Sequence, residues 1–371
     1  MFDVSSLIFI LFLQYVVGRS QFYNKNQLIE GRLLTTVGRF DEDLRCDWSA
    51  STMLVNVIAT RKSVGVEFNF SSCVNGCKIR LEHFVNCVSV GDSIVVGSQD
   101  NSNQIVTITF PASINTSYNV HVTKLSEASC GDAEGVLQLS SVNVIGGHLT
   151  ESSIETSCLA RSKRVLFIGD SITAAYGVEG VYPCSFSIET ENVLKSYAHR
   201  VADAINATAQ IIAWSGKGVV RNYGDPQQLS LQPMPMLYNR TIGNIMNSYW
   251  NPLQFTPHLV MIMLGTNDYS TQPVPSDNQF ISGLNAFVSA VQHDYPSAQL
   301  LLACAPMNNG NQCRNIELVA TSTHTKSVAF VGIPNSVLDD GDTYGCDYHP
   351  SQQQQQSIAN YIIPVISKLL K

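Results

Sequence analysis

Four short polar clusters in this chain carry residue types used in nucleophilic catalysis. They are Gly169-Asp170-Ser171, Ser215-Gly216-Lys217-Gly218, Gly265-Thr266-Asn267-Asp268 and the stretch from Gly345 to Ser351. A serine hydroxyl is a weak nucleophile until a neighbouring base takes its proton, and a histidine can hold that proton and return it to a leaving group. The clusters therefore predict acyl transfer, with Ser171 as the nucleophile and His349 as the base.

Acyl transfer also needs donors for a tetrahedral oxyanion. The candidates are the main-chain amides of Ser171 and Gly216 and the side-chain amide of Asn267. Glycine at position 216 would let the main chain approach closely, since it has no Cβ. Asp347, two residues before the histidine, is expected to fix the tautomer of the imidazole.

Each cluster follows or precedes an element that would position it. Residues 164–169, 209–216 and 258–265 are apolar runs typical of buried strands, and 298–306 and 327–334 are two more. Residues 192–207, 283–295 and 351–371 have helical spacing, with a kink expected at Pro364 and a solvent-facing first turn over the glutamines. This alternation predicts a doubly wound parallel sheet, whose carboxyl edge would gather the clusters.

The first half of the chain has a different pattern. Residues 63–70, 93–98, 104–110 and 118–126 are short, rich in Val, Ile, Phe and Thr, and separated by turn residues. They predict an antiparallel sandwich or jelly roll. A second Gly-Asp-Ser, at 91–93, lies between such runs with no helix after it, and we interpret it as structural.

Composition narrows the class of protein. A net charge of −7, with 14% charged residues, argues against nucleic-acid binding. An apolar run from Leu7 to Val17, too short to span a bilayer, predicts a signal peptide over residues 1–20 and a secreted chain with no membrane attachment after cleavage. Ten cysteines and four Asn-x-Ser/Thr triplets, at Asn69, Asn115, Asn206 and Asn239, agree with disulfides and glycosylation in an exported protein.

The four clusters resemble those of the SGNH, or GDSL-type, hydrolase superfamily, whose named residues map onto Ser171, Gly216, Asn267 and His349. The stretches 215–225, 265–270 and 345–351 are more narrowly similar to carbohydrate esterase family two. That resemblance implies an α/β, flavodoxin-like SGNH domain over residues 160–371, preceded by an all-β jelly-roll domain over 27–155. It also implies removal of acetyl groups from O-acetylated sugars such as xylan, without metal or cofactor. Separately from the resemblance, we expect a monomer.

The resemblance suggests roles for a few further residues. Members of the family can carry an aromatic residue for sugar stacking between the acid and the histidine, and Tyr348 fills that place. Arg221 and Tyr269 are expected to contact substrate, although a turn-closing role for Arg221 and a packing role for Tyr269 are the alternatives. Some family members orient the histidine with a main-chain carbonyl, so the role of Asp347 stays open.

Two other functions remain open from the sequence. A lipid or aryl ester is the first alternative, with the Pro- and Met-containing segment 226–240 as an apolar wall. A glycan-binding protein with a degenerate site is the second.

Overall fold

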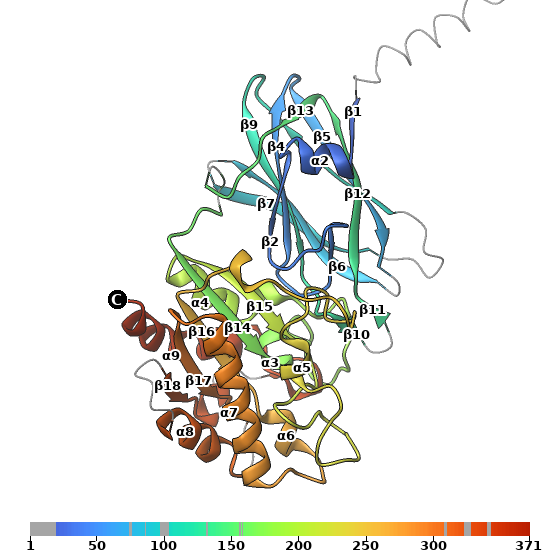
Figure 1. The fold of residues 1–371 in the computed structure, drawn as a ribbon. Coiled ribbons are helices and arrows are strands. Elements are labelled where there is room, and N and C mark those ends of the chain that lie inside the picture. The colour runs from blue at the N-terminus through green and yellow to red at the C-terminus, as the bar shows by residue number, and fades with distance from the viewer. Residues whose placement is uncertain are drawn as a thin grey trace, which may run out of the picture.

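The chain folds into two domains that meet along one side of each (Figure 1). The structure is a computed structural model, which describes residues 20–73, 76–85, 87–96, 104–130, 133–155, 157, 159–307, 310–322, 328–339 and 343–371. The expected signal peptide lies outside the described residues except for Ser20, where β1 begins. In the described part of the chain, every helix is too short or too polar to cross a membrane.

The N-terminal domain consists of two antiparallel sheets packed face to face. One sheet has the order β1-β12-β5-β8, with β3 beside β12, and the other has the order β13-β4-β9-β6-β7, with β2 beside β4. The strands are β1 (Ser20–Asn24), β2 (Leu34–Val37), β3 (Arg45–Cys46), β4 (Thr52–Ala59), β5 (Ser63–Ser72), β6 (Cys77–Val85), β7 (Val88–Val96), β8 (Gln104–Pro111), β9 (Ser117–Lys124), β12 (Leu137–Ile145) and β13 (Gly147–Thr150). The short α2 (Lys25–Glu30) and the hairpin of β10 (Ser129–Cys130) and β11 (Ala133–Glu134) complete this domain.

Alternation along the strands builds the core of the β domain. Val64, Val66, Phe68 and Phe70 occur at every second position of β5 and are all buried. They pack with the inward residues of β4, β6 and β12 in one apolar cluster. The predicted antiparallel architecture is confirmed, and the Gly-Asp-Ser of residues 91–93 lies within β7.

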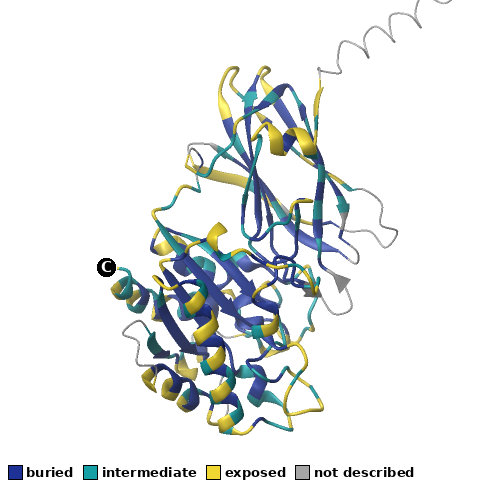
Figure 2. Ribbon diagram, viewed as in Figure 1, coloured by how far each residue is buried: buried dark blue, intermediate teal, exposed yellow. Residues whose placement is uncertain are grey.

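The C-terminal domain is a five-stranded parallel sheet covered on both faces (Figures 1 and 2). Its strand order is β15-β14-β16-β17-β18, the flavodoxin-like arrangement. The strands are β14 (Lys163–Gly169), β15 (Ala207–Ala213), β16 (Leu259–Met263), β17 (Gln299–Cys304) and β18 (Val328–Gly332). The predicted α/β class is therefore confirmed.

Helices cover both faces of this sheet, and each layer buries the strand side chains that point toward it. Side chains of α5 (Met234–Leu237), α7 (Asp277–Asp294) and α8 (Gln312–Ser322) pack on one face. Those of α4 (Tyr197–Ala204) and α9 (Gln352–Leu369) pack on the other. The remaining helical segments are α3 (Ser171–Ala174), α6 (Thr266–Ser270), η1 (Val193–Lys195), η2 (Pro252–Gln254), η3 (Asn335–Asp339) and η4 (Cys346–Tyr348).

Two local predictions for the helices differ from the structure. The helix expected over 192–207 is interrupted, because Ser196 has extended backbone and caps α4 through the amide of His199. The glutamines that open α9 do not all face solvent: Gln354 and Gln355 are fully buried. The side chain of Gln355 donates to the carbonyl of Ile172 and accepts from the amide of Tyr197, so it joins α9 to α3 and α4. Helix α9 continues through Pro364.

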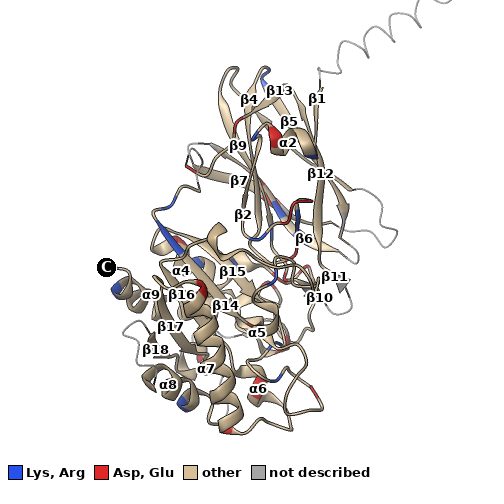
Figure 3. Ribbon diagram, viewed as in Figure 1, with Lys and Arg blue, Asp and Glu red and all other residues tan. Residues whose placement is uncertain are grey.

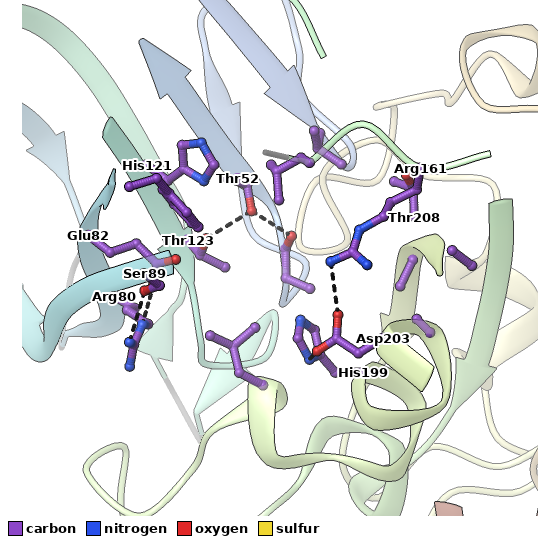
Figure 4. A pocket seen from close by; sticks show the side chains of 18 of the residues that line it. Thr52, Arg80, Glu82, Ser89, His121, Thr123, Arg161, His199, Asp203 and Thr208 are labelled. Carbon is purple, nitrogen blue, oxygen red and sulfur yellow. Dashed lines mark hydrogen bonds and ion pairs between the residues drawn. The ribbon is translucent and has the colours of Figure 1, made fainter. Parts of the chain in front are cut away.

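Buried polar and aromatic side chains join the two domains. The guanidinium of Arg39 is fully buried and donates to the main-chain carbonyl of Arg240 at 2.8 Å. Trp48 packs within the apolar cluster of the C-terminal domain, edge-on to Trp214. Between the domains a cavity of about 370 Å³ is lined by side chains that include Thr52, Thr123, Arg80, His199 and Asp203 (Figure 4). The first residues of β15, from Ala207 to Ala209, are part of the lining, so the cavity lies away from the carboxyl ends of the strands.

Candidate active site

The four polar clusters converge at the carboxyl edge of the parallel sheet. Gly169, at the end of β14, is paired with Ala213 of β15 on one side and with Met263 of β16 on the other. The loops that carry Ser171, Gly216 and Asn267 therefore leave three adjacent strands at one level. The sequence placed these residues correctly because parallel strands end at the same edge.

Ser171 is the first residue of α3, directly after its N-cap, Asp170. The carboxylate of Asp170 accepts a hydrogen bond from the amide of Ile172 at 3.1 Å, which fixes the turn that presents the serine. The hydroxyl oxygen of Ser171 lies 2.8 Å from Nε2 of His349. This distance is within the range required for direct proton transfer.

His349 follows η4, and a main-chain carbonyl orients its ring. Nδ1 of the imidazole lies 3.2 Å from the carbonyl oxygen of Cys346. A carbonyl only accepts, so Nδ1 must carry the proton in this contact, and Nε2 is left to accept from the hydroxyl of Ser171. Burial lowers the pKa of His349 below its ordinary value of 6.5. The neutral imidazole, the form needed for a general base, is therefore favoured.

Asp347 does not make the contact that the sequence suggested. Its carboxylate accepts hydrogen bonds from the hydroxyl of Tyr176 at 2.6 Å and from the amide of Phe186 at 3.2 Å. The backbone of Asp347 is left-handed, with φ of 49°. In this conformation the group that faces Nδ1 of His349 is the carbonyl of Cys346, not the carboxylate of Asp347. Asp347 acts on His349 indirectly, since the ring of Tyr176 packs against the imidazole with centroids 4.1 Å apart.

Gly216 and Asn267 lie where oxyanion donors are expected. Gly216 has φ of 77°, a left-handed conformation that favours glycine, and its amide has no acceptor among the described residues. The side-chain amide of Asn267 donates to the carbonyl of Lys217 at 2.9 Å and lies 3.4 Å from the carboxylate of Asp170. These contacts hold Asn267 next to the turn that carries Gly216.

Two buried carboxylates support these loops. Asp268 accepts hydrogen bonds from the amides of Val219, Val220 and Arg221 at 2.8 to 2.9 Å, and burial raises its pKa to about 6. Burial, with a smaller contribution from Asp268, raises the pKa of Asp170 to about 7. Asp268 therefore shapes the loop after Gly216.

An aromatic pair borders the site on the side of His349. Tyr348 is 55% exposed and packs against Tyr182, which is 39% exposed, with ring centroids 4.1 Å apart and ring planes inclined at 34°. A disulfide between Cys184 and Cys346 fastens the segment that bears Tyr182 to the histidine loop. The two exposed rings form an aromatic surface at the histidine loop. Tyr182 was not foreseen, and sugar stacking on Tyr348 stays a prediction.

Arg221 and Tyr269 were also expected to contact substrate, but the side chains of both make contacts within the protein. Arg221 is fully buried, and its guanidinium donates to the carbonyls of Asp225, Gln227 and Gln272, so it closes a turn. This burial favours the turn-closing role over the predicted contact of Arg221 with substrate. Tyr269 is half-buried against Phe280, and its hydroxyl accepts from Asn315.

Sequence reasoning missed Tyr182 and Phe186 near the histidine and Glu127 near Gly216. No local pattern marks them, because all three lie far along the chain from the residues that they contact. The disulfide between Cys184 and Cys346 would have been the best signal for the first two, but cysteine pairing cannot be deduced from spacing. Cys73 and Cys77 form a second disulfide, and Cys304 and Cys313 a third.

Comparison with known proteins agrees with this geometry. The model of the GDSL-like Lipase/Acylhydrolase family matches residues 167–356, which hold all four clusters. The chain belongs to this family. As a GDSL-like acylhydrolase it is similar to the cellulase/esterase CelE of Acetivibrio thermocellus, with 30% identity over 352 residues, 90% of this chain and 39% of that one. It is also 29% identical to an acetylxylan esterase/glucomannan deacetylase of Cellvibrio japonicus, over 58% of this chain and 62% of that one.

Solved structures extend the similarity of this acylhydrolase to both domains. A family two carbohydrate esterase from Clostridium thermocellum, in complex with cellohexaose, matches 91% of this chain and 99% of its own at 27% identity, with a TM-score of 0.75. A family two esterase from Cellvibrio japonicus has the same fold, with a TM-score of 0.77 at 19% identity. The chain spans about two-fifths to three-fifths of the length of the curated relatives above.

Proposed function

We propose that this acylhydrolase is a secreted serine esterase that removes acetyl groups from O-acetylated carbohydrates, and that it acts as a monomer. The contact between the hydroxyl of Ser171 and Nε2 of His349, at 2.8 Å, carries the proposal. It pairs a nucleophile with its base at the edge of the sheet where Gly216 and Asn267 can receive an oxyanion.

In the proposed reaction, the oxygen of Ser171 bonds to the acetyl carbonyl carbon and its proton passes to Nε2 of His349. The amides of Ser171 and Gly216 and the side chain of Asn267 bind the oxyanion. When the intermediate breaks down, the C–O bond to the sugar is cleaved and His349 returns the proton to the sugar oxygen. A water molecule, deprotonated by His349, then attacks the acetyl-enzyme, and acetate leaves as Ser171 regains its proton.

Carbohydrate is favoured as substrate by the aromatic surface of Tyr348 and Tyr182, since exposed rings stack well on the apolar faces of sugars. The names of the relatives, which include acetylxylan and glucomannan deacetylases, point the same way. Three disulfides in the described residues support export.

The test compares the wild-type chain with Ser171→Ala on acetylated xylan and glucomannan oligosaccharides, with acetate release as the readout. We expect release by the wild type and none above background by the variant. Acetate release by a pure, folded Ser171→Ala chain would refute the mechanism. A wild type that neither releases acetate nor reacts with a fluorophosphonate would instead be a glycan-binding protein.

A lipid or aryl ester is the second candidate, because segment 226–240 does expose apolar side chains. Leu229 and Leu231 are 51% and 93% exposed, and the segment contacts the loop after Gly216 through the amide of Ser230, which donates to the carbonyl of Val220. A series of 4-nitrophenyl esters from acetate to decanoate separates the candidates. A rate that falls steeply beyond acetate favours the carbohydrate esterase, and a rate that rises with chain length favours the lipid esterase.

A further inference from the structure

Two glutamates lie buried together where the domains meet, close to the catalytic loops. Glu127, just after β9 of the β domain, is 2% exposed, and Glu191 of the hydrolase domain is fully buried. The amide of Glu127 donates to the carboxylate of Glu191 at 3.1 Å. Figure 3 shows acidic and basic residues together at this junction, whereas elsewhere they are scattered over the two domains.

The carboxylate of Glu127 reaches across the junction to the oxyanion loop. It accepts a hydrogen bond from the amide of Ser215 at 2.5 Å, and Ser215 is the residue directly before Gly216. Within the C-terminal domain, the amide of Lys217 donates to the carbonyl of Trp214, that of Tyr223 donates to the carbonyl of Gly216, and the side chain of Asn267 donates to the carbonyl of Lys217. The hydroxyl of Ser215 has no partner among the described residues. Glu127 is thus the side chain that anchors the amide of Ser215.

We propose that Glu127 is a positioning residue for the oxyanion hole, through which the β domain fixes the direction of the Gly216 amide. The amides of Ser215 and Gly216 belong to consecutive planar peptide units joined at the Cα of Ser215, so anchoring the first unit leaves only the two dihedrals of Ser215 to set the direction of the Gly216 amide. The inference rests on the proposed function, because it assigns the Gly216 amide to the oxyanion. It makes the β domain part of the catalytic apparatus rather than a separate module.

Position, not charge, is the property of Glu127 that matters here. Lys124 is fully buried nearby, but its ammonium donates to the main-chain carbonyls of Ser126 and Glu127 and not to a carboxylate. Burial raises the pKa of Glu127 to about 7, and burial together with Glu127 raises that of Glu191 well above its ordinary value. A carboxyl oxygen accepts from Ser215 in either protonation state, so a neutral side chain with an oxygen in the same place should serve as well.

The experiment uses two variants of nearly equal size. Glu127→Gln keeps an acceptor oxygen, whereas Glu127→Met fills the volume without one and removes a buried charge, a change that buried sites often tolerate. The control is Asp47→Asn. Asp47 is also a buried carboxylate of the β domain that accepts main-chain amides across the junction, from Gly243 and Asn244 at 2.9 Å, and neither of these belongs to the turn of Gly216.

Two readouts follow the chemistry: kcat and KM on 4-nitrophenyl acetate, and the rate at which a fluorophosphonate labels Ser171. We expect Glu127→Met to lose about 10- to 100-fold in kcat and in labelling, with KM little changed, since a displaced donor weakens transition-state binding. Glu127→Gln should stay close to the wild type, and so should Asp47→Asn, even where its Tm falls.

The outcomes separate this inference from the proposed function. An active wild type with an equally active Glu127→Met variant would overturn the positioning role alone. The positioning role would also be overturned if Asp47→Asn is slowed as much as Glu127→Met, because any weakening of the junction would then have the same effect. A wild type that neither turns over esters nor reacts with the fluorophosphonate would remove the proposed function, and this inference with it.

Discussion

The carboxylate of Asp347 accepts a hydrogen bond from the hydroxyl of Tyr176 at 2.6 Å, and the ring of that tyrosine packs against the imidazole of His349. The nearest acidic side chain thus holds an aromatic ring beside the base, while the carbonyl of Cys346 orients Nδ1. The pair of Ser171 and His349 works with a main-chain partner, and this arrangement has measurable consequences.

Asp347→Asn should lower kcat/KM by no more than about 10-fold, because Nδ1 keeps its carbonyl partner, whereas the same change in a Ser-His-Asp triad costs about 10⁴. Kinetics on 4-nitrophenyl acetate measure this, with His349→Ala as the inactive reference. A loss of three orders of magnitude or more would mean that the carboxylate orients the imidazole directly.

Asn267→Ala should lower kcat by about 100-fold with little change in KM, because the side-chain amide is expected to bind the oxyanion more tightly than the ground state. Asn315→Ala is a matched control: Asn315 is also buried and donates two side-chain hydrogen bonds, to Tyr269 and Asp277. It should lower Tm but leave kcat unchanged. Equal losses of kcat in both variants would argue against Asn267 as an oxyanion donor.

The pH dependence of kcat/KM should reflect the buried histidine. Burial lowers the pKa of His349 below 6.5, and only the neutral imidazole accepts the proton of Ser171. As the pH rises through this lowered pKa the active fraction increases, so kcat/KM should reach half its maximum below pH 6.5 and stay level to neutrality. A midpoint above pH 6.5 in buffers of constant ionic strength would show that the site stabilises the charged imidazole instead.

The disulfide between Cys184 and Cys346 should affect both stability and catalysis, because it fastens the segment of Tyr182 to the loop of His349. Replacing both cysteines by serine should cost about 5 kcal/mol of unfolding free energy for a loop of this length, and should also lower kcat/KM. Removing the Cys304–Cys313 disulfide, whose residues are only 9 positions apart, is the control. It should cost about 2 to 3 kcal/mol and leave kcat/KM unchanged. Denaturant unfolding measures the change in stability and kinetics measures the change in kcat/KM. Larger losses in the variant without Cys304–Cys313 than in the variant without Cys184–Cys346 would contradict this assignment.

Tyr348→Ala should raise KM for acetylated xylo-oligosaccharides by roughly 10-fold, as expected for the loss of one stacked ring. It should leave kinetics on 4-nitrophenyl acetate unchanged, since that ester is too small to need the aromatic surface. Tyr361→Ala removes an exposed tyrosine of α9 and serves as the control. An unchanged KM for the oligosaccharide in Tyr348→Ala would mean that the sugar lies elsewhere.

Strand and helix order, and the edge at which the clusters meet, follow from local pattern. Apolar runs such as 259–263 have no polar side chain to expose, so they predict a strand covered on both faces, and the structure buries all five residues of β16. The placement of Ser171, Gly216 and Asn267 needed no more than this, because each comes directly after a strand. The burial of Gln355 was missed because its partners, in α3 and α4, are more than 150 residues away.

Periodicity and the residue types at strand ends are enough to establish the two-domain architecture, the parallel sheet and the residues that meet at its carboxyl edge. Three features could be known only from the folded chain: the group that faces Nδ1 of His349, the burial of Arg221, and the support that Glu127 gives to the turn of Gly216. The first depends on the backbone dihedrals of Asp347 and its neighbours. The other two depend on contacts between residues that are 47 to more than 80 positions apart in the chain. A hydrogen bond of that kind is set by how the domains pack, and no local pattern encodes it.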